Sequence, residues 1–271
     1  MLFKQWNEVD EPRHHLDSPT AFGNEDSLQE ASLPVLEFPQ IDWSHYTKVF
    51  FTTAIMEPLF PKTLLNTKKL GDIKAVLTLN GNPPKADSHS WNFEENFPNE
   101  LNPEERISST SFTFLTPVVA FGDTLLIMVK ENFLKVSPII YNQLANELVS
   151  GIICGAQAQE QELRVLGTSD RITELKSISD KRSDLRPPEF VTGFVGSILT
   201  QLIVNRLPFQ GLIAPSEGAT GFEKMSMETV PELIDICNEW IALDLENYKS
   251  ECYRQCRRDG AATGSLSGLY I

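Results

Sequence analysis

Two cysteines near the C-terminus stand at a spacing that metal sites use. Cys252 and Cys256 are four residues apart in a segment with helical periodicity, so both would lie on one helix face, as in half of a zinc site. No second pair of Cys or His stands at a suitable spacing to complete four ligands. The other interpretation is a pair of buried free thiols. We therefore expect no metal site.

The four histidines all lie in the irregular N-terminal half, which does not favour a histidine general base. They are His14, His15, His45 and His89. The chain contains no Walker A loop, no G-x-G-x-x-G fingerprint and no G-x-S-x-G nucleophile elbow. In the closest approach to the elbow, Gly-Ser-Leu-Ser-Gly, Leu266 stands where the serine belongs. We expect no catalytic residues, no cofactor and no enzymatic activity.

The segment 214–221 is the best alternative position for an active site. It follows a predicted strand at its carboxyl end, where open α/β sheets bind ligands, and Gly218 and Gly221 would let the backbone approach an anion. An enzyme of the nucleoside-phosphorylase-like α/β type, using this loop, is the alternative function. The simpler interpretation is a tight connection in which Ser216 and Glu217 satisfy backbone groups.

The last three residues form the preferred candidate site. Leu269, Tyr270 and Ile271 make up a hydrophobic-tyrosine-any pattern (HbYX motif) that ends in a free carboxylate. A Gly/Ser-rich stretch precedes them, and nine flexible residues of such composition reach about 15–18 Å. We interpret the three residues as a docking element on a flexible tail.

Strands and helices alternate in the segments that must position these residues. Runs of β-branched and apolar residues predict strands, and apolar residues at helical spacing predict helices. The predicted strands are 48–54, 73–79, 111–115, 124–129, 163–167 and 211–214, and the predicted helices are 138–155, 191–205, 228–242 and 246–258. The last helix would place Tyr248, Cys252 and Cys256 on one stripe.

This order predicts an α/β fold, a three-layer sandwich with a mixed, partly parallel sheet flanked by helices. We expect an extended acidic arm over residues 1–44 and a single α/β domain over 45–258, with an acidic excursion at about 80–110. The flexible tail covers 259–271. The two acidic, Pro-rich stretches cannot be continuous helices.

The charge pattern restricts the partners. With 37 acidic against 23 basic residues the net charge is −14, which argues against nucleic acid or an anionic membrane as the main partner. Residues 1–40 and 81–106 carry most of this excess, and they are hypothesised to meet a basic surface. The chain shows no signal peptide, membrane-spanning run, disulfide framework or N-glycosylation acceptor, so we expect a cytoplasmic and nuclear location.

Several segments, taken in order, resemble the proteasome assembly chaperone family. They are Met1–Asn7, Ser90–Glu100, Pro188–Leu202, Ala214–Gly218, Gly221–Lys224, Glu251–Arg254 and Ser267–Ile271. The resemblance covers almost the whole chain and is weakest around residues 80–89 and 106–111 and in the middle of the arm.

The resemblance implies a non-enzymatic chaperone that forms a heterodimer with a second, related α/β subunit. Such a pair binds the α-ring of the proteasome core particle, promotes its assembly and blocks premature docking of regulators. The family's C-terminal motif enters a pocket between neighbouring α subunits, and here it corresponds to Leu269, Tyr270 and Ile271. An acidic scaffold without the proteasome is a third possibility.

Overall fold

The computed structural model describes residues 34–78, 111–130, 138–155, 161–217 and 224–258. Nearly all of them belong to one compact unit, Pro34–Val76 together with Thr113–Ile271. The other unit, Met1–Leu33 with Leu77–Phe112, consists mainly of residues outside the described ranges. The predicted boundaries at residues 44 and 258 stay predictions.

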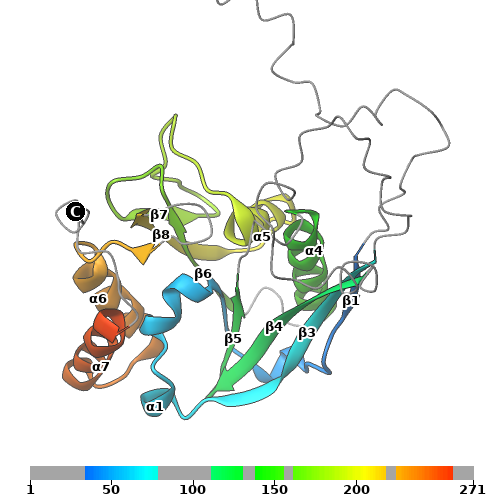
Figure 1. Ribbon diagram of the computed structural model, residues 1–271, viewed down its shortest axis with the longest axis horizontal. Helices are drawn as coiled ribbons and strands as arrows, with labels where there is room; N and C mark the ends of the chain where they lie inside the picture. Colours follow the sequence, from blue (N-terminus) through cyan, green and yellow to red (C-terminus); the bar gives the residue numbers. More distant parts are fainter. Residues whose placement is uncertain (1–33, 79–110, 131–137, 156–160, 218–223, 259–271) are drawn as a thin grey trace, which may run out of the picture. The chain divides into compact units, whose positions relative to one another are not determined.

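A mixed sheet runs through the described part of the chain in the order β1-β3-β4-β5-β2-β6-β8-β7, with β9 paired to β8 (Figure 1). Its strands are β1 (Val35–Glu37), β2 (Lys48–Thr53), β3 (Lys68–Thr78), β4 (Ser111–Phe121), β5 (Thr124–Val129), β6 (Glu162–Ser169), β7 (Lys176–Ser179), β8 (Phe209–Glu217) and β9 (Lys224–Met225). The neighbours β5, β2, β6 and β8 are parallel, whereas β4 pairs with β5 and β7 with β8 in antiparallel fashion. The predicted mixed, partly parallel sheet is confirmed.

The central strand β2 is buried on both faces. Successive strand residues point to opposite faces, so Phe50 and Phe51 enter two different apolar clusters. Both side chains are fully buried. This explains why Val49–Thr53 is buried at every position and contains no charged residue, instead of alternating with charged residues.

Helices cover both faces of the sheet. They are α1 (Lys62–Leu65), α4 (Pro138–Cys154), α5 (Gly193–Val204), α6 (Val230–Ile241) and α7 (Leu245–Arg258), with the 3-10 helices η4 (Trp43–His45) and η5 (Ala54–Leu59). Helices α4 and α5 pack on the face that receives Phe51, and η5, α6 and α7 pack on the face that receives Phe50. The three-layer α/β architecture predicted from the sequence is therefore confirmed.

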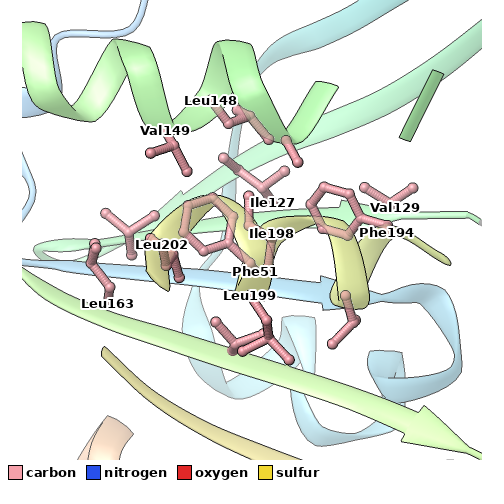
Figure 2. Close-up of a cluster of buried hydrophobic side chains, with 14 of the residues drawn as sticks. Phe51, Ile127, Val129, Leu148, Val149, Leu163, Phe194, Ile198, Leu199 and Leu202 are labelled. Atoms are coloured by element: carbon pink, nitrogen blue, oxygen red, sulfur yellow. The ribbon is translucent and has the colours of Figure 1, made fainter. Parts of the chain in front are cut away.

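Helix α5 lies very close to strand β6. Figure 2 shows Phe194, Ile198, Leu199 and Leu202 of α5 directed toward Phe51 and neighbouring strand residues. A Cβ atom at Gly167 of β6 would stand 2.6 Å from Val195 Cγ1, well inside van der Waals contact. A glycine at this position is thus what allows the helix to approach the sheet.

The predicted helices and strands match the structure within three residues at each end, except that β3 begins five residues before the predicted strand 73–79 and β4 ends six residues after the predicted strand 111–115. Several short elements were not predicted. These are β1, β7, β9, α1, η4 and η5. Strand β1 lies inside the range expected for the arm and pairs with β3 through Val35 and Val76. No helix in the described residues is long and apolar enough to cross a membrane.

Candidate functional site

The three residues of the preferred site, Leu269, Tyr270 and Ile271, lie outside the described residues, so their docking role stays a prediction. Helix α7, from which the C-terminal segment continues, is described to Arg258. Helix α7 is therefore the last described element before the C-terminal segment.

One stripe of α7 is buried. Tyr248, Cys252 and Cys256 are each 0% exposed and pack in the apolar cluster with α6 and η5, as their i, i+4, i+8 spacing predicted. The Tyr248 hydroxyl donates a hydrogen bond of 2.8 Å to the main-chain oxygen of Leu59. Burial raises the pKa of Tyr248, so the phenol stays protonated. The helix is thus held to η5 by packing and by one buried polar contact.

Ion pairs flank this buried stripe of α7. Arg254 donates two hydrogen bonds to Glu251, at 2.6 and 2.8 Å, and Thr63 of the neighbouring segment donates a third at 3.3 Å. Hydrogen bonding from Arg254 is the main reason why the pKa of Glu251 falls from 4.5 to about 2. Lys249 pairs with Asp235 of α6 at 2.7 Å. The Arg254–Glu251 pair lies within α7, whereas the contacts with Thr63 and Asp235 connect α7 to the neighbouring segment and to α6.

The thiols near the C-terminus are buried groups rather than exposed ligands. Burial raises the pKa of Cys252 to about 12 and also raises the pKa of Cys237, so both are protonated at neutral pH. No group of three or more potential metal ligands occurs among the described residues. Protonated, fully buried thiols are poor metal ligands and poor nucleophiles, which fits the interpretation as apolar core residues.

The segment 214–221 begins as a strand and not as a loop. Residues 214–217 belong to β8, and Ser216 pairs with Met225 of β9. Ala214 is fully buried and Ser216 is 8% exposed. Ala214 is the last residue of the predicted strand and lies in β8 as expected. The expectation of a βα loop is wrong for residues 215–217, because pairing with β6 and β9 extends β8 to Glu217. Residues 218–221, including both glycines, lie outside the described residues.

Charged residues at the amino ends of β2 and β6 bind α6. The Arg164 guanidinium lies 4.8 Å from the ring centre of Trp240 and donates to Glu162 at 2.9 Å. The ammonium of Lys48 donates to the main-chain oxygen of Trp240 at 3.0 Å. These cations hold a helix against the sheet, and they lie at the edge opposite to the carboxyl ends where α/β sheets bind ligands.

An apolar hollow beside α5 escaped the sequence reasoning. It has a volume of about 540 Å³, and its apolar lining is formed by Ile178, Leu185, Phe190, Val191, Leu199 and Ile203. Lys176, at one end of strand β7, is buried and forms ion pairs with Glu174 at 2.6 Å and with Glu189 at 3.2 Å. The sequence signal that could have pointed to this hollow is the composition of α5, which contains no charged residue.

The comparisons with known proteins decide the family. A family model described as POC1 chaperone matches residues 1–271. Proteasome chaperone 1 of Saccharomyces cerevisiae is 44% identical over 280 aligned residues, and the match covers 100% of both chains. The chain belongs to the POC1 chaperone family. The resemblance to proteasome assembly chaperones noted from the sequence is confirmed.

A crystal structure of a more distant protein was also matched. Pyrococcus furiosus PbaA, described as an archaeal homolog of proteasome-assembly chaperone, is 12% identical, with a TM-score of 0.49. The match covers 83% of this chain and 94% of PbaA. Independently of this match, the family model and the yeast relative are both named as chaperones and not as enzymes.

Proposed function

We propose that this POC1 chaperone is one subunit of a heterodimer that assembles the proteasome core particle. With a related α/β subunit it binds the α-ring, promotes ring formation and blocks premature docking of regulators. The observation that carries this proposal is the 44% identity to a protein named Proteasome chaperone 1, over the whole length of both chains. The acidic net charge agrees with a protein partner rather than a nucleic acid.

The proposed docking element is the C-terminal tripeptide, which enters a pocket between α subunits. Burying Leu269 and the ring of Tyr270 contributes about 1.5–3 kcal/mol each. A charge-assisted bond from the Ile271 carboxylate to a pocket cation adds about 1.5–3 kcal/mol. Ordering each residue of the preceding stretch costs about 1–2 kcal/mol.

A single tail therefore binds weakly, which suits a chaperone that later leaves. A second tail on the partner subunit and the surfaces of the folded domains raise the total affinity, since each later contact becomes intramolecular. We also propose that the chain works in the cytoplasm and the nucleus, which fluorescence microscopy of a tagged chain tests directly.

Binding of the heterodimer to immobilised, purified core particle tests the docking element. Deleting residues 269–271, or substituting Tyr270→Ala, is expected to weaken binding roughly 10- to 100-fold, because at least one buried apolar side chain is lost. The control is Leu266→Ala, an equally apolar truncation in the same tail outside the motif. Undiminished binding of the deletion variant in biolayer interferometry refutes the docking role.

A further inference from the structure

The two helical layers of this protein differ sharply in charge. Helix α4 has one charged residue among 17 and α5 has none among 12. On the other face, α6 has three among 12 and α7 has six among 14. A helix at the protein surface normally has one apolar face toward the core and one charged face toward solvent. In the centres of protein interfaces, by contrast, charged residues are depleted. The layer formed by α4 and α5 thus has the composition of a contact surface.

Large apolar side chains are exposed on this layer. At the end of α5, Ile203 and Val204 are 55% and 69% exposed. Phe190, just before α5, is 47% exposed and lines the hollow of about 540 Å³ together with Ile203. The hollow can receive an apolar side chain of a partner, and the protruding aliphatic side chains can enter a hollow on that partner. The centres of stable interfaces combine both kinds of contact.

The surface continues from α5 onto α4. The two helices pack side by side on the same face of the sheet (Figure 1). The Ser197 hydroxyl donates to Asn142 Oδ1 at 2.6 Å across their outer surface. Ile139 and Ile153, which are 43% and 45% exposed, extend the apolar character along α4.

The size of this face fits a stable dimer. At 1.5 Å per residue, α4 and α5 are about 26 and 18 Å long, and two packed helices are about 20 Å wide. With the hollow beside them they present several hundred Å², on the order of the 800 Å² that each partner contributes to a standard interface. At one rim of the hollow, Asp180, Lys181 and Arg182 provide the mixed charges typical of an interface edge.

The charge of the chain restricts what covers this face. Residues 1–40 and 81–106 carry net charges of −6 and −4, so these segments are poor complements for an uncharged apolar surface. A second copy would bring together two chains of net charge −14, which repel each other. A different protein with an equally uncharged contact surface fits best.

We propose that the layer of α4 and α5, with the hollow beside α5, is the surface that binds the related α/β subunit. The partner then presents a matching pair of uncharged helices and inserts an aliphatic or aromatic side chain into the hollow. This proposal rests on the heterodimer of the proposed function. It leaves the charged layer of α6 and α7 free.

A paired substitution on the exposed end of α5 tests this surface. The full chain, affinity-tagged, replaces Proteasome chaperone 1 in Saccharomyces cerevisiae, and mass spectrometry quantifies the second chaperone subunit and the core-particle α subunits that co-purify. We expect Ile203→Asp with Val204→Asp to lower recovery of the second subunit at least tenfold, because carboxylates would be buried without partners. Leu245→Asp on α7, where the leucine is 37% exposed, is the matched control and leaves recovery unchanged.

The outcomes separate the two proposals. If the unsubstituted chain captures neither the second subunit nor α subunits, the proposed function fails. If it captures both and the α5 variant still recovers the second subunit at a 1:1 ratio, the interface proposal is overturned. A loss of α subunits with the second subunit retained also overturns it, since the face then contacts the core particle.

Light scattering of the purified chain is expected to give the mass of a monomer, 30.4 kDa. If the chain is instead a dimer and the α5 variant abolishes that dimer, the face binds a second copy and the proposal is overturned. Circular dichroism establishes that each variant is folded.

Discussion

Tyr248 offers a way to test how α7 is held, because its hydroxyl can be removed without changing the shape of the ring. Tyr248 and Leu59 are both 0% exposed, and the hydroxyl donates to the Leu59 main-chain oxygen at 2.8 Å. In Tyr248→Phe the ring still packs among the buried residues of α7, but the carbonyl loses this donor in a site without solvent. The variant therefore isolates the hydrogen bond from the packing.

The expected cost is about 1–3 kcal/mol in the free energy of unfolding, the range for a buried polar group that loses its partner. For a domain of this size, each kcal/mol lowers Tm by roughly 2–4 °C, so Tm should fall by about 2–12 °C. Urea unfolding followed by circular dichroism provides the free energy. The midpoint should fall while the m-value stays constant, since the folded and unfolded surfaces are nearly unchanged.

The matched control is Tyr253→Phe, which removes the same atom from a half-buried tyrosine of the same helix. A change below about 0.5 kcal/mol is expected there, as is usual away from buried polar contacts. If Tyr248→Phe unfolds at the same urea concentration as the unsubstituted chain, the hydrogen bond to Leu59 does not hold α7, and the reasoning is refuted.

Three further predictions concern packing, pH and thiol reactivity. Gly167→Ala should cost about 1–3 kcal/mol in urea unfolding, because the new Cβ would overlap Val195; an unchanged midpoint contradicts the close approach of α5. The pKa of Glu251 lies below its ordinary 4.5, so its stabilisation is present above pH 4.5 and is lost as pH falls toward about 2. The Tm difference between the unsubstituted chain and Glu251→Gln should therefore be largest near neutral pH and shrink toward pH 2, and a pH-independent difference refutes this. With a thiol reagent, exposed Cys154 should react promptly and the buried thiols only on unfolding, whereas rapid reaction of a second thiol contradicts their burial. The buried thiols are Cys237, Cys252 and Cys256.

Strongly patterned elements were predictable from the sequence. The apolar run Thr124–Val129, which follows a Gly-Asp turn, is the strand β5 with both ends as predicted. Strand β7, Lys176–Ser179, was missed because a four-residue run with one apolar residue carries almost no signal. It forms through antiparallel pairing with β8 on one side and main-chain contacts with residues 182–184 on the other. Tertiary pairing of this kind also converts residues 215–217 from a predicted loop into the end of β8.

The candidate site was predictable only in part. The stripe of Tyr248, Cys252 and Cys256 followed from helical spacing and is confirmed, and the tripeptide 269–271 stays a prediction. The absence of charge in α5 was visible in the sequence, but periodicity does not tell which of its apolar residues stay exposed. Packing against β6 and α4 decides this, and it leaves Ile203 and Val204 outside the core.

The central claim is that this POC1 chaperone acts on the proteasome core particle, and quantitative mass spectrometry of proteins bound to the tagged chain tests it most directly. In Saccharomyces cerevisiae that lacks Proteasome chaperone 1, we expect core-particle α subunits to co-purify with the chain in amounts comparable to the chain itself, in preference to mature regulators. Recovery of the folded chain without α subunits, under conditions where Proteasome chaperone 1 retains them, would contradict the claim.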